Sequence, residues 1–405
     1  MNHRQSWVSL LMLAGWLCPF TVPAQIDPVK RDLLQLGYNA ALQDHAPPSG
    51  YAFYYRNQPG FLRTNLTLRL AVAPTYLDSE LGIARALGEH THLGVGLAGG
   101  GYADSYYETR RGTYRPSQSF TGYGAETSLS LYHLFNPERE IPLYGLVRAT
   151  GHYSTYERSS DTADDFRLPQ DCGTFGFRTG LRWGGQEPVL FPDLAMELSC
   201  WYEGLFRTGA GNYGYGDRSV ESWSHLFWGE ALLAYTLPES KHRFFISLTA
   251  GASLEADRFS AYRLGSLLPL ASEFPLSLPG YYYQELSARH FMLASGSYLV
   301  PLDARQHWNL TATASTALVD YLPGLEQPGR WHTGVGAGIL FKSPSWKIMV
   351  GYGYGVDAMR SHGRGAHSVG VLIQFDLDRA REGLLTPRQP GRWRGFRQLL
   401  EGVGL

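Results

Sequence analysis

Long apolar segments are missing from this 405-residue sequence once its first 25 residues are passed. No later stretch approaches the roughly 18 consecutive apolar residues that a transmembrane helix needs, so no such helix is expected there. Charge is also scarce: 18% of the residues are charged and the formal net charge is −1. A near-neutral chain gives no reason to expect a nucleic-acid partner.

Cysteine is rare as well, with three residues in the whole chain. Cys18 lies in the N-terminal apolar segment, whereas Cys172 and Cys200 fall in expected strands on opposite faces. A cross-strand disulfide needs both side chains on one face. We therefore expect two free thiols.

The N-terminus has the pattern of an export signal. A short polar start with Arg4 precedes an apolar run from Trp7 to Val22, and Val22-Pro23-Ala24 offers a small-residue cleavage site. The sequence thus predicts a signal peptide over 1–24. An exported chain without membrane helices is either soluble or a β-barrel.

Glycine and aromatic residues are plentiful, with 47 Gly, 26 Tyr and 10 Trp. Between 331 and 377, apolar residues alternate with glycine, serine and charged residues, which is typical of half-buried β-strands. The glycine-rich face is too small and polar for the core of a sandwich, whereas an apolar face toward lipid and a polar face toward a lumen fit the pattern. The apolar positions are Val335, Ala337, Ile339 and Phe341; Val350, Tyr352 and Tyr354; and Val369, Val371, Ile373 and Phe375.

Similar segments recur from residue 63 onward and predict about 14 strands, with room for two more, 16 in all, within 30–60. Each is long enough for the roughly 9–11 residues of a tilted membrane strand. We expect them near 63–72, 79–88, 91–104, 120–134, 142–157, 172–184, 191–206, 224–236, 242–258, 286–299, 306–320, 331–342, 345–358 and 366–377.

Short and long connections between these strands alternate, apart from a brief one at 75–78. The long ones are expected at 105–119, 158–171, 207–223, 259–285, 321–330 and 359–365. A membrane barrel places tight turns on the periplasmic side and long loops outside, whereas a soluble sandwich does not separate its loops in this way. The fold expected is all-β: a transmembrane antiparallel β-barrel with long extracellular loops and short periplasmic turns. We expect it in the outer membrane of a Gram-negative-type bacterium, with both termini periplasmic.

Four regions follow from this interpretation: the signal peptide at 1–24, a periplasmic lead-in at 25–60, the barrel at 61–377 and a basic tail at 378–405. A weak helical pattern through 27–43 predicts a short helix in the lead-in. The tail carries six arginines and is either simply solvated or a periplasmic contact with anionic lipid or a partner protein.

Tryptophans near strand ends are expected in the two interfacial girdles of a membrane barrel. They are Trp183, Trp201, Trp228, Trp308, Trp331 and Trp346.

Two stretches carry a family resemblance. Leu278-Pro279-Gly280-Tyr281 lies at the tip of the loop 259–285, and the strand after it ends in Tyr298-Leu299-Val300-Pro301-Leu302. The second stretch is GVGAGILFKSP (334–344) followed by GYGYG (351–355). Both resemble the Omp85 superfamily of outer-membrane proteins, which includes BamA and TamA (bacterial surface antigen D15-type barrels). The resemblance covers roughly the last 145 residues, and five strands follow the loop, as in the family.

The resemblance implies a barrel whose loop 259–285 folds into the lumen. The chain departs from the family where Pro279 replaces an arginine and Gly351 replaces its acidic partner inside the barrel. The joint loss suggests that the loop docks through Tyr281, Tyr282 and Tyr283 over a glycine-lined wall; alternatively, the glycines only ease curvature. The wall residues expected to face the loop are Gly334, Gly336, Gly338, Gly351 and Gly353. Separately, the end of the last strand resembles a β-signal at Val371, Ile373 and Phe375.

The chain also departs from the family in its apparent extent: it has no room for periplasmic POTRA repeats and no patatin domain.

Catalytic, cofactor and metal sites are not expected. The sequence 94–99 matches G-x-G-x-x-G, but it continues as strand and no helix follows to hold a pyrophosphate. His90 and His92 lack further ligands nearby. Asp161, Asp164 and Asp165 are more simply an exposed loop tip than a calcium site.

The function expected from the resemblance is non-enzymatic, in outer-membrane biogenesis or protein translocation. Its partners would be outer-membrane lipid, lipopolysaccharide and a periplasmic or assembly-machinery protein. Two alternatives stay open: a passive or gated porin-like channel, and a surface-binding barrel that uses its outer loops.

Overall fold

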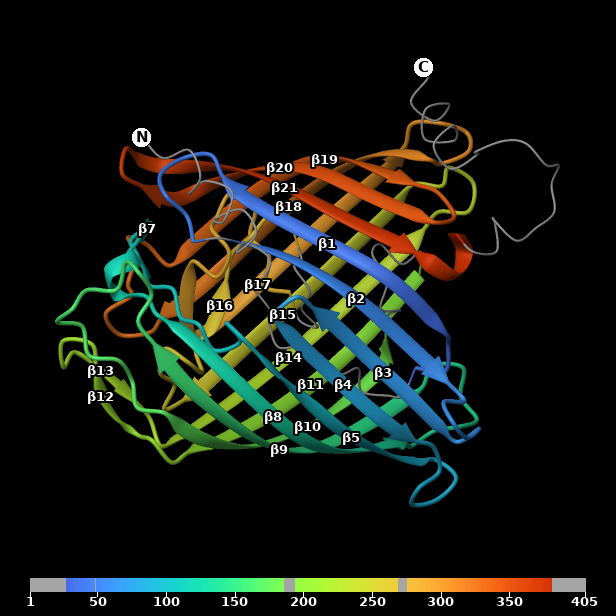
Figure 1. Ribbon diagram of the computed structural model, residues 1–405. Helices are drawn as coiled ribbons and strands as arrows, with labels where there is room; N and C mark the ends of the chain where they lie inside the picture. The colour runs from blue at the N-terminus through green and yellow to red at the C-terminus, as the bar shows by residue number, and fades with distance from the viewer. Residues whose placement is uncertain (1–26, 48, 186–193, 269–274, 381–405) are drawn as a thin grey trace, which may run out of the picture.

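The computed structural model describes residues 27–47, 49–185, 194–268 and 275–380. Most of its strands form one antiparallel sheet that closes on itself into a barrel (Figure 1), and β6–β7 and β12–β13 form two separate two-stranded sheets. The sheet has 17 strands, of which β16 is a three-residue strand that only pairs with β17 and the others form the wall.

The wall strands are β1 (Arg31–Ala41), β2 (Gly50–Pro59), β3 (Leu66–Ala73), β4 (Tyr76–Ile83), β5 (Thr91–Gly100), β8 (Thr121–Leu134), β9 (Leu143–Glu157), β10 (Cys172–Gly185), β11 (Leu194–Arg207), β14 (Trp223–Thr236), β15 (Arg243–Leu254), β17 (Leu286–Pro301), β18 (Trp308–Tyr321), β19 (Trp331–Lys342), β20 (Trp346–Arg360) and β21 (Gly363–Asp376). The connections contain β6 (Thr109–Arg110), β7 (Thr113–Tyr114), the 3₁₀ helix η2 (Pro116–Gln118), β12 (Gly211–Tyr213), β13 (Arg218–Val220) and β16 (Tyr262–Leu264).

Closure comes from the pairing of the first and last strands. β1 runs antiparallel to β21, from Leu33 opposite Asp376 to Ala41 opposite Ser368. Every wall strand therefore has a neighbour on both sides, and no backbone edge is left unpaired, as a lipid environment requires.

The outer face of the wall is apolar. Large side chains that stand exposed on it include Val95, Leu129, Val147, Phe177, Leu198, Phe227, Ile246, Met292, Leu310, Val335 and Val350. The residues between them point inward. This confirms the expected transmembrane β-barrel and its period-two pattern. No helix in the described part of the chain combines the length and the apolar composition needed to cross a membrane.

The expected lead-in at 25–60 is wrong from Arg31 onward, because β1 and β2 occupy it and neither is helical. They are the two further strands for which 30–60 had room, so the alternative of 16 wall strands is confirmed. In β2 the usual polarity is inverted: Tyr51 and Phe53 are buried inward, whereas Tyr54 and Arg56 lie on the other face. The part of the lumen next to β2 is filled with apolar side chains. A strand that faces it therefore does not show the pattern of polar inward residues that identified the other strands.

The long connections gather at one end of the barrel, where Figure 1 shows β7, β12 and β13. The expected long connection at 359–365 is wrong, because β20 and β21 are joined by residues 361–362 alone. The opposite end carries the short turns, the start of β1 and the end of β21. The signal peptide and most of the basic tail lie outside the described residues.

The tryptophans divide between the two faces. Trp183 and Trp331 are exposed on the outside, and Trp308 and Trp346 pack there on Phe341 and Phe375. Trp201 and Trp228 instead point into the lumen and stack on each other, with ring centroids 6.3 Å apart. Their assignment to the girdles is wrong, because both lie on the inward parity of their strands, with Glu197 and Glu230.

Candidate functional site in the barrel lumen

The connection between β15 and β17 folds against the inner wall of the barrel. β16 pairs with the start of β17, and the Leu278 N–H donates to the Ser266 carbonyl at 2.8 Å. Leu264, Leu278 and Tyr281 are each fully buried. We call residues 262–268 and 275–285 the docked loop.

The tip of the docked loop meets glycines on β19 and β20. A Cβ added to Gly334 would lie 2.3 Å from the Pro279 carbonyl oxygen, and one added to Gly353 would lie 2.9 Å from the Gly280 nitrogen. Gly280 itself has a φ of +84°, and a Cβ there would lie 1.8 Å from the nitrogen of Gly355. Both surfaces need glycine, because the two backbones approach too closely for a side chain.

Leu267 and Leu268 cover the next part of the wall. A Cβ on Gly336 would lie 3.1 Å from Leu267 Cδ1, and one on Gly351 would lie 3.4 Å from Leu267 Cδ2. These leucines pack in a core inside the barrel whose other buried members are Tyr51, Phe53, Ala71, Ala73, Leu299, Leu340, Met349 and Leu372. The lumen on this side is therefore filled with packed apolar side chains.

Two details of the expected contact differ. The three atoms nearest to a Cβ on Gly338 all belong to β20, with the Val350 carbonyl oxygen at 2.7 Å. Among the tyrosines, Tyr281 is the one against a wall glycine, since a Cβ on Gly355 would lie 2.9 Å from its ring. Pro279, Gly280 and Leu267 cover the remaining glycines, because the close backbone approach leaves no room for an aromatic ring.

A buried ion pair fastens the end of the docked loop to β20. Arg360 Nη1 lies 3.0 Å from Glu285 Oε1, and both side chains are completely buried. The guanidinium also donates to the Gly280 carbonyl at 3.1 Å and lies 3.7 Å above the ring of Tyr282. Glu285 in turn accepts the Tyr282 N–H at 2.8 Å.

Sequence reasoning missed this pair because it looked for a charge at Pro279 and Gly351 and concluded that both charges had been lost. The structure instead has the arginine on the wall and the carboxylate on the loop. A signal was available: Glu285 is the one acid between Pro275 and Ser287, in a segment rich in tyrosine and leucine.

Tyr281 adds a second polar attachment. Its hydroxyl lies 3.0 Å from Nδ1 of His332 on β19, and the other ring nitrogen of His332 bonds the hydroxyl of Tyr321 on β18. Since the three side chains are buried, this chain of hydrogen bonds satisfies groups that would otherwise cost free energy to desolvate.

The docked loop also spans the junction where the barrel closes. On the β1 side, the Leu267 N–H donates to Asn39 Oδ1 at 3.4 Å and the Tyr282 hydroxyl donates to the Gln43 carbonyl at 3.2 Å. On the β21 side, the Gly280 N–H donates to Ser368 Oγ at 3.1 Å. One loop thus holds both strands of the closing pair.

The β-signal-like residues of the last strand do not contact the docked loop. Val371, Ile373 and Phe375 are on the outer face of β21, opposite Tyr38, Leu36 and Leu34 of β1.

The rest of the inner wall, from β3 to β15, carries charges that are paired across strands, beside small apolar clusters that include Trp201 and Leu232. Arg69 contacts Asp78 at 3.0 Å, Arg148 contacts Glu80 at 3.3 Å, and further pairs join β10 to β11. The lumen therefore has two unlike halves, one apolar and covered by the docked loop, the other lined by compensated charge.

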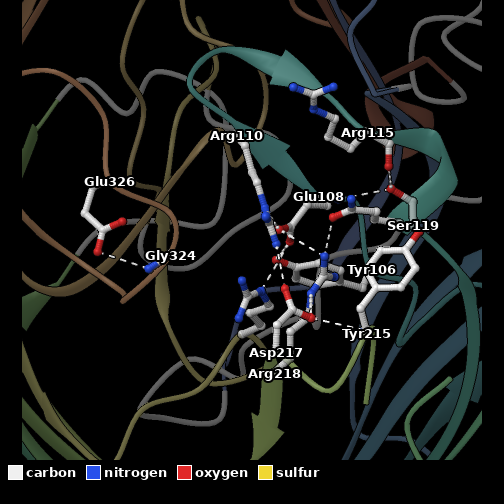
Figure 2. Close-up of polar contacts among 12 residues, drawn as sticks. Tyr106, Glu108, Arg110, Arg115, Ser119, Tyr215, Asp217, Arg218, Gly324 and Glu326 are labelled. Carbon is white, nitrogen blue, oxygen red and sulfur yellow. Dashed lines mark hydrogen bonds and ion pairs between the residues drawn. The ribbon is translucent and has the colours of Figure 1, made fainter. Parts of the chain in front are cut away.

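Outer connections pack together around one buried carboxylate, Glu108 (Figure 2). It accepts hydrogen bonds from Tyr106 at 2.6 Å and from Arg258 at 3.3 Å, and it pairs with Arg110 and Arg218. These residues come from the β5–β8 and β11–β14 connections and from the first part of the β15–β17 connection. We call residues 101–120, 208–222 and 255–261 the cap. Aromatic side chains of these connections, together with Phe166 of the β9–β10 connection, form a small core beside them: Tyr106, Phe120, Phe166, Tyr213 and Phe259.

Opposing effects set the pKa of Glu108. Burial by itself would raise the pKa, but the charges of Arg258 and Arg218 and the hydrogen bonds from Tyr106 and Arg110 outweigh it, so that the pKa is lowered from its ordinary 4.5. Glu108 is therefore a carboxylate at neutral pH and links the cap connections as an anion.

Neither thiol chemistry nor a metal centre stands out in the described ranges. Cys172 is buried, Cys200 is exposed, and both are free, as their opposite faces predicted. No group of three or more His, Cys, Asp or Glu side chains there could hold a metal ion.

Solved structures with the same fold were found by comparison of backbones. CdiB from Escherichia coli matches with a TM-score of 0.56 and 12% identity, over 88% of this chain and 64% of that one. CdiB from Acinetobacter baumannii matches with a TM-score of 0.54 and 11% identity, over 86% and 60%. BamA from Haemophilus ducreyi lacking POTRA domains 1–3 matches with a TM-score of 0.53 and 11% identity, over 85% and 70%.

The fold is that of the CdiB and BamA barrels. This bears out the Omp85 resemblance for the barrel fold. The chain spans 60–70% of the length of these three structures. No family model matches the chain, and no curated protein matches its sequence.

Proposed function

We propose that this Omp85-type barrel lies in a bacterial outer membrane and acts without enzymatic chemistry in protein translocation or outer-membrane biogenesis. In this proposal the short turns and both termini face the periplasm, and the docked loop closes the lumen at rest. The observation that carries the proposal is the docked loop, which is fastened by Arg360 and spans the β1–β21 junction in a barrel with the fold of CdiB and BamA.

The arrangement supports a resting state that can be released. Three kinds of contact hold the docked loop: close backbone approach at Gly334 and Gly353, the Arg360–Glu285 pair, and the Tyr281–His332 hydrogen bond. Releasing the loop would clear the apolar half of the lumen and remove hydrogen bonds from both strands of the junction. A polypeptide substrate that reaches the lumen from the periplasm would then meet space along one side and paired charges along the other.

A gated channel for solutes is the second candidate function. It is favoured by the charged half of the lumen, because compensated and partly exposed pairs such as Arg178–Glu203 would line an aqueous path without selecting strongly for one sign of ion. In that case the docked loop would constrict the path, and no protein client would be needed.

Single-channel conductance of the refolded barrel tests the closed state. The full chain is compared with a variant that lacks residues 266–284 and with Arg360→Ala, which keeps the chain length. We expect the full chain to conduct little and both variants to open. A full chain that conducts steadily would contradict a closing loop and favour a plain porin. Co-purification of periplasmic clients with the full chain would then separate translocation or biogenesis from solute passage.

A further inference from the structure

A cluster of basic side chains lies on the outer wall, at the rim where the long connections begin. Arg289 and His290 of β17 both reach Asp320 of β18: Arg289 Nη2 lies 3.2 Å and His290 Nδ1 3.0 Å from Asp320 Oδ2. Arg330, just before β19, lies 3.9 Å from Asp320 Oδ1. Two basic side chains of β17 and one from the residue before β19 thus meet one carboxylate of β18.

A β-bulge explains how two consecutive residues of β17 face the same partner. The pairing shifts between Ala288 and His290, so that Arg289 is the additional residue and His290 lies opposite Asp320. In a regular strand, neighbouring side chains point to opposite faces, whereas a bulge turns the additional one aside. The bulge therefore concentrates positive charge on the outer face.

The cluster has more positive than negative charge and can therefore bind a further anion. Two arginines and a histidine surround one carboxylate, which leaves a net positive charge even when His290 is neutral. The side chains of Arg289, His290 and Arg330 are 44%, 47% and 72% exposed. A guanidinium presents its donors in a fork that fits the oxygens of a phosphate.

Immediately beneath the charges runs an apolar row on the same three strands. Met292 pairs with Leu318, and Leu318 pairs with Trp331; Met292 is 42% and Trp331 58% exposed. Exposed tryptophan is typical of the depth where acyl chains meet headgroups. The acyl chains of a lipid on this wall would pack against the apolar row, and its headgroup would contact the basic cluster above it.

We propose that Arg289, His290 and Arg330 bind the phosphate of lipopolysaccharide in the outer leaflet. This site rests on the proposed location and orientation, which place the long connections outside the cell. The ligand class follows from the chemistry: a phosphate-bearing headgroup matched by an arginine pair, on a lipid with acyl chains for Met292, Leu318 and Trp331. Binding there would fix the rotation and depth of the barrel in the membrane on the β17–β19 side.

The test uses purified lipid A, with its phosphates intact or removed, titrated into the full chain and measured by native mass spectrometry. The Arg289→Gln/Arg330→Gln variant loses two charges at the site. The matched control, Arg139→Gln/Arg305→Gln, loses two exposed charges at the short-turn rim. Each arginine near an anionic headgroup contributes about 1 kcal/mol, so we expect a roughly fivefold to thirtyfold weaker affinity in the first variant alone, and no difference between chains for the dephosphorylated lipid.

Equal affinity of the full chain and the site variant for intact lipid A would overturn the proposal, as would equal affinity of the full chain for the two lipids. The single variant Arg330→Gln is expected to fold normally, because Arg330 makes only a 3.9 Å contact in this cluster and its side chain is 72% exposed. It should show part of the loss of affinity for lipid A. Conductance is measured on the same samples. A barrel that stays closed but does not bind lipid A would refute this site and leave the proposed function standing.

Discussion

Removing the guanidinium of Arg360 is the most direct test of what holds the docked loop in the lumen. Arg360→Ala leaves Glu285 buried with no counter-ion, removes the bond to the Gly280 carbonyl and takes away the cation above the Tyr282 ring. The wall strand itself is expected to keep its backbone pairing, since Arg360 is the last residue of β20.

The expected penalty is large because both partners are completely buried. Breaking a buried ion pair by removing one partner costs about 3–5 kcal/mol, mostly from the charge that is left uncompensated. One factor of ten in an equilibrium constant corresponds to about 1.4 kcal/mol. The population with the loop released should therefore rise by roughly two to three and a half orders of magnitude.

Chemical labelling of a buried loop position measures this population. Ser266 is 1% exposed, and Ser266→Cys in a chain with Cys18, Cys172 and Cys200 all replaced by serine gives a single reporter thiol. Its rate of reaction with a water-soluble maleimide should rise with the released fraction. The matched control is the double variant Glu285→Leu/Arg360→Met, which removes both charges and keeps apolar volume, and which should label nearly as slowly as the parent.

The reasoning would be refuted if Arg360→Ala, shown to be folded by its heat-modifiable migration, labelled at the parental rate. It would also fail if the double variant labelled as fast as Arg360→Ala, because loss of packing alone would then explain the release.

Two further predictions concern the wall and the cap. Gly353→Ala should destabilise docking by about 1–3 kcal/mol through overpacking, because its Cβ would lie 2.9 Å from the Gly280 nitrogen; Gly296→Ala, with nothing within 4 Å of the added atom, is the control, and equal reporter labelling in the two would contradict close approach. Lowering the pH should loosen the cap, because the folded pKa of Glu108 lies below its ordinary 4.5. The stabilisation from Glu108 is thus present above that value and lost as the pH falls through the folded pKa. Proteolysis of the cap should accelerate below about pH 4.5 in the parent, and a Glu108→Gln variant with the same pH profile would show that another group is responsible.

Most of the wall could be predicted from the sequence because membrane strands obey a strict rule. From β3 to β21, lipid on one side and a polar or glycine-lined interior on the other impose alternation, and residues such as Val335 and Gly336 carry it locally. The opposite faces of Cys172 and Cys200 followed from the same parity. These features depend on neighbours along one strand, which the sequence shows directly.

The docking of the loop was partly predictable as well. The family resemblance pointed to Leu278-Pro279-Gly280-Tyr281 and to glycines on the wall, but sequence spacing carries no information on which atoms meet. The structure brings Pro279 to Gly334 and Gly280 to Gly353, sets Gly338 apart, and covers the wall with Leu267 in place of the expected aromatic rings.

Tertiary structure alone decided the features that join distant segments. The first two strands were hidden because Tyr51 and Phe53 face an apolar lumen, which exists only once the loop from 262 onward has docked beside them. Trp201 and Trp228 can face inward because their rings stack on each other and each ring also lies against a guanidinium, that of Arg182 or Arg178. The Glu285–Arg360 pair crosses 75 residues. Alternation is a property of one strand and its solvent, whereas these contacts depend on where the closed barrel places the other strands.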